Sequence, residues 1–478
     1  MTPTVALVPW WVWPAAHLAV CTAAALVLPR RRSPQAASAW LLLIFLAPWL
    51  GVPLFLLVGR VGPSRRTRKA MAMLPGRAAR AAERLLAHVE AHDPFDGQGV
   101  HPTAALASRL GHFRPLRGNA VEVVADYDAA VDGLVADIDA ARDHVHLLYY
   151  IFAGDRTGRR VGEALLRARE RGVACRVLAD AVGSRADGRA WVRELSRRGV
   201  DAVLVAPVKF RRMFFRRPDH RNHRKIAVVD GRVAWTGSQN VVDADLGGGL
   251  RCEDLVVRLG GPVVVALQYV FLADWWLARG EMLDAARHLP PPVPAGDVVA
   301  QALPSGPTFA ADSFQWVLVD LLHRARERAV VVSPYFVPDA PILQALGAAA
   351  ARGVDVRVVV PKRSDQVGIG LAVESYFEDL AEHGVHVHRY LPAFLHAKHM
   401  TVDDEVAVVG SSNVDVRSFA LNDEITLVVY DRAVARRLRA EEDRYLAASE
   451  ELDLDAWEQR GPGRRVLQSV ARLFTPIL

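Results

Sequence analysis

The sequence predicts an α/β protein in which two tandem domains, each a mixed sheet flanked by helices, are related by pseudo-twofold symmetry and follow an N-terminal two-helix hairpin. Three observations lead to this fold class. Two long stretches near the N-terminus carry no Asp, Glu, Lys or Arg, and strand and helix patterns alternate from residue 119 onward. One motif, H-x-K-x4-D, occurs at residues 223–230 and again at 396–403. At 478 residues, the chain is long enough for two or three domains.

Residues 1–60 are expected to form a transmembrane hairpin, with helices over about 6–28 and 36–58. Both apolar runs exceed the ~20 residues that a helix needs to cross hydrocarbon. Tryptophans stand near the ends of the runs, as they do at membrane interfaces: Trp10, Trp11, Trp13, Trp40 and Trp49. A cleaved signal peptide is disfavoured by the second apolar run and by the lack of a basic first segment. Two buried core helices are the other alternative. The basic clusters at 30–32 and 65–69 do not decide on which side of the membrane the chain ends lie.

Residues 61–115 are rich in Ala, Arg and Leu, with helical spacing over 78–91. They are expected to form an amphipathic connector near the membrane surface. A solvated linker helix is an equally open interpretation.

The two α/β domains are expected over residues 116–290 and 296–478, joined by a proline-rich linker at 289–294. In the first domain, the patterns predict strands at 145–152, 173–179, 200–205, 225–230 and 233–236, with helices at 161–171 and 191–198. The second domain repeats this order, since 147–155 aligns with 331–339 and 171–178 with 352–359. Residues 208–219, just before the first motif, have no counterpart.

Each motif places a histidine and a lysine two residues apart: His223 with Lys225, and His396 with Lys398. On a strand, both side chains of such a pair leave the same face. Pairing the two copies would bring two imidazoles and two ammonium groups into one site. This set suits a phosphodiester, because the lysines can hold nonbridging oxygens while one histidine attacks phosphorus and the other protonates the leaving alcohol. Water or a second alcohol would then resolve the phosphohistidine. Only five of the 59 basic residues are lysines, and two of them occupy these equivalent positions.

The remaining candidate site residues follow each motif. Asp230 and Asp403 end the two motifs at predicted turns, and we expect them to position the site by hydrogen bonding rather than to react. A G-S-x-N turn comes next, and its side chains are expected either to bind phosphate or to hold the motif: Ser238, Asn240, Ser411 and Asn413. An acidic residue precedes the following strand in each copy, Asp254 and Glu424. These acids are expected either to fix a histidine tautomer or to form surface salt bridges.

The segment 208–219 interleaves basic and aromatic residues immediately before His223. We expect it to contact the membrane, with aromatic rings in lipid and arginines on anionic head groups: Phe210, Phe214, Phe215, Arg211 and Arg212. An ordinary loop packed on the domain is the alternative.

The sequence contains no cluster of Asp, Glu or His with metal-ligand spacing, so we expect chemistry that uses neither a metal nor a cofactor. The three cysteines are widely spaced and predict no disulfide framework.

The two motifs with their G-S-x-N partners resemble the phospholipase D superfamily, and within it the chain is similar to bacterial cardiolipin synthases over nearly its whole length. The segments that carry the closer resemblance are 32–40, 57–59, 334–339, 410–418, 422–424 and 473–478. The resemblance implies two phospholipase D-like domains that share one active site and a multi-pass enzyme of the bacterial cell membrane. It also implies a reaction that joins two phosphatidylglycerols into cardiolipin and releases glycerol, through a phosphatidyl-histidine intermediate. The implied partners are anionic phospholipids, phosphatidylglycerol and cardiolipin, and not nucleic acid.

Three other interpretations stay open at this point. A phospholipase D-type hydrolase would resolve the same intermediate with water, a superfamily nuclease would suit the net charge of +6, and a membrane scaffold would need no chemistry. The sequence does not decide which histidine is the nucleophile, although His223 is favoured, or whether phosphatidylethanolamine is the donor. It also leaves the oligomeric state open.

Overall fold

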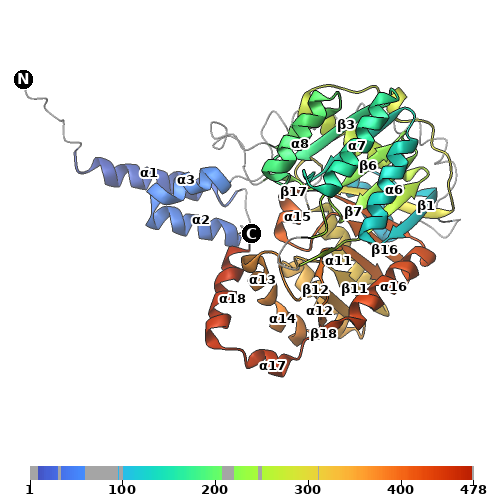
Figure 1. The fold of residues 1–478 in the computed structure, drawn as a ribbon. Helices are drawn as coiled ribbons and strands as arrows, with labels where there is room; N and C mark the ends of the chain where they lie inside the picture. The colour runs from blue at the N-terminus through green and yellow to red at the C-terminus, as the bar shows by residue number, and fades with distance from the viewer. Residues whose placement is uncertain are drawn as a thin grey trace, which may run out of the picture. The chain divides into compact units, whose positions relative to one another are not determined.

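The computed structural model describes residues 9–30, 34–59, 95, 101–206, 220–245, 250–309 and 312–475. The chain separates into two compact units (Figure 1). The described residues up to 59 form the N-terminal unit, and those from 95 onward form the α/β unit. The proposed helix at 78–91 and the basic-aromatic segment 208–219 lie outside the described residues.

The N-terminal unit consists of three apolar helices: α1 (Val12–Val27), α2 (Pro34–Leu46) and α3 (Pro48–Val58). The expected single helix over 36–58 is wrong, because the chain breaks at Ala47, whose backbone angles of −143° and 71° are not helical, and Pro48 starts a new helix. The two pieces fold back on each other, and the rings of Trp40 and Phe55 meet edge to face with centroids 5.3 Å apart. Among the described residues, no helix combines the length and the apolar character that crossing a membrane requires.

The first half of the α/β unit alternates strands and helices as predicted, with ends shifted by a few residues. A helix that precedes its first strand belongs to the same unit, because α5 buries Ala104 and Ala107 and packs on β10 and α11. The elements are α5 (Pro102–Gly111), β1 (Leu116–Val124), α6 (Tyr127–Ala140), β2 (His144–Tyr149), α7 (Arg156–Glu170), β3 (Ala174–Asp180), α8 (Arg185–Arg197), β4 (Asp201–Val205), β5 (Arg221–Asn222), β6 (Ile226–Val229), β7 (Val233–Gly237), β8 (Cys252–Glu253), β9 (Val256–Gly260), α9 (Val263–Arg279) and α10 (Ala285–His288).

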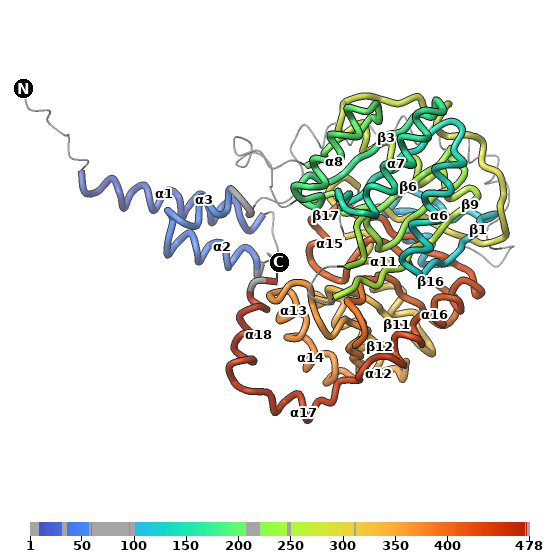
Figure 2. The backbone as a smooth tube through the Cα atoms, viewed as in Figure 1, coloured from blue at the N-terminus to red at the C-terminus, as the bar shows by residue number. Residues whose placement is uncertain are grey.

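The second half repeats this order and ends in additional helices (Figure 2). Its elements are β10 (Val298–Ser305), α11 (Ser313–Arg324), β11 (Arg328–Val332), α12 (Ala340–Ala351), β12 (Asp355–Pro361), α13 (Val367–Glu374), α14 (Phe377–Glu382), β13 (His386–Tyr390), β14 (Phe394–Leu395), β15 (His399–Val402), β16 (Val406–Gly410), α15 (Val416–Ala420), β17 (Asn422–Tyr430), α16 (Arg432–Ala447), β18 (Ser449–Glu451), α17 (Leu454–Glu458) and α18 (Pro462–Phe474).

One continuous sheet runs through both halves, with the strand order β18-β13-β12-β11-β15-β16-β17-β10-β1-β9-β7-β6-β2-β3-β4. The order reads the same outward from the central pair, so that β1 corresponds to β10, β9 to β17, β7 to β16 and β6 to β15. The two halves join where β1 pairs antiparallel with β10. The pseudo-twofold axis predicted from the repeat therefore passes between these two central strands.

The halves also exchange short strands. Residues 221–222 of β5 run parallel to the start of β17 in the second half, and residues 394–395 of β14 run parallel to β8 in the first half. The chain thus enters each motif through a short strand that pairs with the two residues just before Glu424 or Asp254 of the other half.

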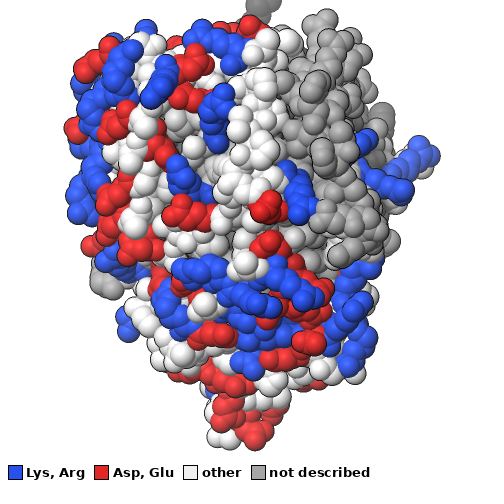
Figure 3. Space-filling model, turned by 90° about the vertical axis from the view of Figure 1, so that its right-hand side faces the viewer, with Lys and Arg blue, Asp and Glu red and all other residues white. Residues whose placement is uncertain are grey.

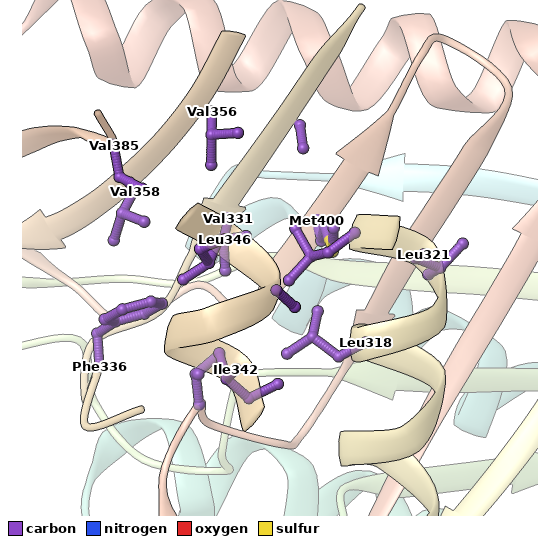
Figure 4. Close-up of a cluster of buried hydrophobic side chains, with 14 of the residues drawn as sticks. Leu318, Leu321, Val331, Phe336, Ile342, Leu346, Val356, Val358, Val385 and Met400 are labelled. Atoms are coloured by element: carbon purple, nitrogen blue, oxygen red, sulfur yellow. The ribbon is translucent and has the colours of Figure 1, made fainter. Parts of the chain in front are cut away.

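Hydrophobic packing covers both faces of the sheet. Helices α6, α7 and α8 cover the first half with one core, and α11 and α12 cover the second half with another. Figure 4 shows this second core, in which Leu318 and Leu321 of α11 and Ile342 and Leu346 of α12 lie over strand residues such as Val331. A third core between α9 and α16 contains residues of both halves, so burial of apolar surface also holds the halves together.

Candidate active site

The two motif histidines each hydrogen bond to an acidic residue of the other half. His223 Nδ1 lies 2.9 and 3.0 Å from the two carboxylate oxygens of Glu424. His396 Nδ1 lies 2.7 Å from Asp254 Oδ1. Both carboxylates are buried, at 0% exposure for Glu424 and 3% for Asp254, whereas the histidine side chains keep 11% and 12%. The acids are therefore not surface salt-bridge partners, and each fixes the proton of an imidazole on Nδ1 so that Nε2 is left for chemistry.

The local backbone differs from the predicted strand. Residues 223–225 and 396–398 are irregular, since β5 and β14 end just before them and β6 and β15 begin just after. The His223 amide donates to the carbonyl of Asp423 over 2.8 Å, and the His396 amide donates to the carbonyl of Glu253 over 2.7 Å. These bonds across the halves hold each histidine next to its carboxylate, whose residue directly follows the accepting one.

The two lysines are placed identically. The Lys225 ammonium donates to the His223 carbonyl over 2.8 Å, and the Lys398 ammonium donates to the His396 carbonyl over 2.7 Å. Burial lowers the pKa of Lys225 to about 7 and that of Lys398 to about 8, against the attraction of Glu424 and Asp254. Below these pKa values the two ammonium groups are both charged and poorly hydrated, and such a pair attracts an anion strongly.

The histidines respond to the same charges. Burial lowers the pKa of His223 to about 4, opposed by Glu424 and assisted by Lys225 and Lys398. Burial also lowers the pKa of His396, opposed by Asp254 and assisted by both lysines. The lysine of each half thus helps to lower the pKa of the histidine in the other half, so the two motifs are close enough to interact electrostatically.

The carboxylates are held ionised despite burial. Burial acts to raise the pKa of Asp254, but His396 and Lys398 outweigh it and bring the value to about 2. For Glu424, burial is likewise outweighed by His223 and Lys225, and its pKa is lowered. Glu424 also accepts hydrogen bonds from the Ser411 hydroxyl over 2.5 Å and from the Ser418 hydroxyl over 3.0 Å.

Three of the four G-S-x-N side chains hold the backbone around the site by accepting hydrogen bonds from main-chain amides. The Ser238 and Ser411 hydroxyls accept from the amides of Leu255 and Ile425, over 2.9 and 3.0 Å, and so anchor the strands that carry the acids. The carbonyl oxygen of Asn240 accepts from the Ile151 amide over 3.1 Å. The corresponding Oδ1 of Asn413 is buried, and the described residues offer it no hydrogen-bond partner.

Asp230 and Asp403 are not brought to the histidine–lysine centre. Each occupies a turn with positive φ, 52° and 51°, at the end of the strand inside its motif, β6 or β15, that is remote from the histidine. The Asp230 carboxylate accepts from the amides of residues 142, 143 and 144 over 2.8–2.9 Å. Asp403 accepts from those of residues 326, 327 and 328 over the same distances. Their contacts are those of turn anchors rather than reacting groups.

Two features of the site were not singled out from the sequence. The Tyr150 ring meets the His223 ring edge to face, with centroids 4.8 Å apart. Arg224, inside the first motif, is fully buried and pairs with Asp274 over 2.6 Å, and it donates to the Glu424 carbonyl over 3.0 Å. The second motif has Ala397 at this position. The difference between H-R-K in the first motif and H-A-K in the second was the sequence signal for this ion pair. A buried arginine requires a buried acidic partner, which the second motif does not need.

The predicted membrane-contact residues Phe210, Arg211, Arg212, Phe214 and Phe215 lie outside the described residues.

Within the described parts of the chain, one histidine cluster away from this centre has the spacing of a metal site. His144, His146 and His288 are buried, with nitrogens within 4.8 Å of one another. Several of these nitrogens are already engaged, His144 with Asp143 and both strand histidines with Gln268. The Arg176 guanidinium lies 3.1 Å from His146 Nε2 and repels a cation. We interpret the cluster as a hydrogen-bonded part of the core.

The chain matches known proteins along its whole length. A family model described as "Cardiolipin synthase, PLD-like domain" matches residues 134–275 and 318–446, and one described as "Phospholipase_D-nuclease N-terminal" matches residues 18–60. Cardiolipin synthase A of Salmonella gallinarum is 33% identical over 468 residues, which cover 95% of each chain. Cardiolipin synthase A of Escherichia coli K12 is 32% identical over 494 residues, which cover all of both chains.

A solved structure supports the fold. Phosphatidylserine synthase of Haemophilus influenzae superposes with a TM-score of 0.61 at 14% sequence identity, covering 79% of this chain and 100% of that one. Both family-model matches on the α/β unit contain one complete histidine–lysine motif. The chain therefore belongs to the cardiolipin synthase family and carries its phospholipase D-like domain twice.

Proposed function

We propose that this chain is a membrane-bound phosphatidyltransferase that makes cardiolipin from two phosphatidylglycerols and releases glycerol. The observation that carries the proposal is the pair of buried histidine–carboxylate couples, each made across the two halves, beside two buried lysines. Such a site offers one nucleophile, one proton donor and two cations, which is what displacement at a phosphodiester requires. The full-length similarity to cardiolipin synthases supports this choice of reaction.

The first step transfers the phosphatidyl group to the protein. Nε2 of His223 forms a bond to phosphorus, the bond from phosphorus to the glycerol oxygen breaks, and His396 gives its Nε2 proton to the departing glycerol. Lys225 and Lys398 hold the nonbridging oxygens while charge shifts to the leaving oxygen. The anionic phosphodiester also raises the pKa of His396 when it binds, which favours the protonated form that this step needs.

The second step uses another phosphatidylglycerol. Its terminal hydroxyl gives a proton to Nε2 of His396 and attacks phosphorus, and the bond to His223 breaks. Cardiolipin leaves, and both histidines regain their starting protonation states. If water takes the place of this hydroxyl, the product is phosphatidic acid and the enzyme acts as a hydrolase.

The roles of the two histidines follow from an asymmetry between the carboxylates. Glu424 shares its charge among His223, Ser411 and Ser418. A carboxylate that already accepts several hydrogen bonds stabilises an adjacent imidazolium less, which suits a neutral nucleophile at His223. Asp254, 2.7 Å from His396, makes fewer such contacts among the described side chains and is better placed to stabilise the proton donor.

The remaining residues take supporting roles in this proposal. Ser238, Asn240, Ser411 and Asn413 shape the phosphate-binding wall, while Asp230 and Asp403 hold the turns on which the motif strands rest. The domains that carry them are assigned to 116–290 and 296–478.

Membrane attachment is assigned to the N-terminal unit and to the segment 208–219. The helices α1, α2 and α3 contain no Asp, Glu, Lys or Arg and expose large apolar side chains, such as Trp49 at 78%, Leu46 at 76% and Trp13 at 71%. Side chains of this kind are stable in lipid and not in water. We propose that this unit forms the hairpin that inserts into the bilayer, from residues 1 to 60.

A nuclease is less well supported. The net charge of +6 is the observation that favours a nuclease. On the face shown in Figure 3, however, the acidic and basic side chains of the described residues are interspersed and form no uniform basic surface for nucleic acid.

Product analysis tests the proposal. The purified full chain, reconstituted with phosphatidylglycerol vesicles, should yield cardiolipin and glycerol, and mass spectrometry should find phosphatidyl-histidine at residue 223. His223→Ala and His396→Ala should each abolish turnover. His386→Ala, which removes an exposed histidine that also pairs with a carboxylate, should not. Phosphatidic acid as the sole lipid product would show a hydrolase, and full activity of either active-site variant would reject the mechanism.

A further inference from the structure

The C-terminal helix α18 is amphipathic in the opposite sense from a normal surface helix. Its sequence, PGRRVLQSVARLF, contains three arginines and no acid. Among its described side chains, Gln468 and Ala471 are the buried ones, at 2% and 9% exposure. Four of its large apolar residues are exposed, and we call them the α18 stripe: Val466 at 62%, Leu467 at 56%, Val470 at 44% and Leu473 at 77%. Their spacing places them along one side of the helix.

Polar contacts attach the other side of α18 to the α/β unit. The Gln468 amide donates to Glu374 at the end of α13 over 2.9 Å, and Arg464 donates to the same carboxylate over 2.6 Å. Arg472 pairs with Asp379 of α14. These bonds fix the rotation of the helix about its axis, so the α18 stripe is held outward by the fold. Figure 1 shows α18 at the left edge of the α/β unit, beside α13.

The charges around the α18 stripe favour an anionic surface. All charged residues of α18 are arginines. Arg465 is exposed and forms no ion pair with a carboxylate in the described part of the chain. Apolar side chains flanked by arginine are the pattern of helices that lie in the interface of anionic membranes. A water-soluble surface would instead place the polar face of this helix outward.

A short chain of contacts joins this region to the active site. Val367, the first residue of α13, is 80% exposed, and Asp365, two residues earlier, accepts a 2.8 Å hydrogen bond from Tyr335. The Tyr335 ring lies 6.1 Å from that of Phe394, which lies 5.7 Å from the ring of His396. The start of α13 is therefore connected to His396 through Tyr335 and Phe394.

We propose that the α18 stripe is a membrane-docking surface, which inserts into the interface of an anionic bilayer and holds the α/β unit against its lipid substrate. This inference rests on the proposed function, because a phosphatidyltransferase must reach lipids in a membrane. It assigns the second half a membrane contact of its own, in addition to that of the N-terminal unit.

A fluorescence experiment on the full chain tests this surface. Leu467→Cys carries a polarity-sensitive dye, and Met282→Cys, whose native side chain is 59% exposed elsewhere on the α/β unit, is the matched control. Unsubstituted protein corrects for labelling of Cys21, Cys175 and Cys252. In vesicles of phosphatidylcholine and phosphatidylglycerol, the dye at 467 should shift to the blue and be quenched by lipids with a nitroxide on the acyl chain. The dye at 282 should do neither.

The outcomes separate docking from catalysis. An unquenched dye at 467 in a preparation that makes cardiolipin would overturn the docking surface and leave the proposed function intact. Quenching without cardiolipin would support docking and count against the function. A blue shift before vesicles are added would also overturn docking: if it grows with protein concentration, a second copy covers the stripe, and if it does not, another part of the same chain does.

A second variant keeps the test independent of labelling. Replacing Val466, Leu467, Val470 and Leu473 by serine should lower turnover on phosphatidylglycerol vesicles about tenfold, since interfacial binding scales with buried apolar area. Turnover of dispersed short-chain phosphatidylglycerol should change less than about twofold, because no surface has to be bound. Met282→Ser with Val293→Ser is the control, and it should alter neither rate. Unchanged vesicle turnover in the fourfold variant would refute the proposal.

Discussion

Replacing Glu424 by glutamine tests whether the charge contributed by the second half controls the histidine of the first half. Glutamine keeps the size of the side chain but removes the charge and turns one acceptor into a donor. Ser411 donates to one carboxylate oxygen and Ser418 to the other, while His223 Nδ1 lies within 3.0 Å of both. Either orientation of the amide therefore sets its NH2 group against a hydroxyl donor.

The magnitude follows from these contacts. Losing a charge-assisted hydrogen bond costs about 1.5–3 kcal/mol. In addition, the amide no longer favours the tautomer with hydrogen on Nδ1, so Nε2 is no longer the free nucleophile. In hydrolase triads, the equivalent change of an acid to its amide lowers kcat by about 10⁴. We expect a fall of about 10³ to 10⁴ in kcat for Glu424→Gln, which corresponds to about 4–5.5 kcal/mol in the barrier.

The assay is the initial rate of cardiolipin formation in phosphatidylglycerol vesicles, followed by mass spectrometry. Glu442→Gln is the matched control, because Glu442 is also fully buried, accepts from Thr401 over 2.6 Å and lies 3.3 Å from His399 outside the site. The control should lower the thermal midpoint without changing kcat by more than about threefold, since its hydrogen bonds are structural. If Glu424→Gln kept more than about a tenth of wild-type kcat, or if both variants lost activity equally, the assigned role would be wrong.

Three further predictions follow from the described contacts. The value of kcat/KM should fall as pH rises through about 7 to 8, because burial lowers the pKa of Lys225 to about 7 and that of Lys398 to about 8. A neutral amine no longer attracts the phosphodiester. A pH profile of kcat/KM that stays flat to pH 10 would contradict this prediction. Asp230→Ala leaves three backbone amides without their acceptor and should cost about 1–3 kcal/mol of stability, while kcat per folded molecule changes less than about threefold. Thermal unfolding measures the loss of stability, and an active-site titration gives kcat per folded molecule. Asp403→Ala should behave in the same way. Arg224→Met strands the buried carboxylate of Asp274 and should destabilise the protein by about 3–5 kcal/mol; an unchanged thermal midpoint would show that the pair is dispensable.

Much of the α/β unit was predictable because its signals are local. The strands at 145–152 and 173–179 and the helix at 161–171 were expected from runs of apolar residues, and β2, β3 and α7 occupy these places. The duplication predicted two halves with the same order of elements, and the mirrored strand order agrees.

The pairing across the halves was not readable from the sequence. Asp254 and Glu424 stand downstream of the motif in their own half, and nothing local shows that each reaches the histidine of the other half. The exchange depends on the short strands β5 and β14, whose two residues are too few to give a hydrophobic period. The sequence pattern is also insufficient at 223–225. It predicts a regular strand there, but the backbone is irregular and places His223 beside Glu424.

The break between α2 and α3 had a local signal that hydropathy outweighed. Pro48 follows Ala47 within a run without charges, and the residue before a proline is disfavoured in helical backbone. A window that averages apolar character passes over this position.

The reciprocal pairing has a consequence for synthesis of the chain. During translation, residue 223 leaves the ribosome long before residue 424 is made. The first motif therefore emerges without the carboxylate that orients its histidine. Until β10 is made, β1 also presents an unpaired strand edge to other nascent chains. A truncated product would therefore expose the unpaired edge of β1, which favours aggregation. It would also lack the carboxylate that orients His223, so it would not react with phospholipids. Catalytic competence arrives only when nearly the whole polypeptide has been translated.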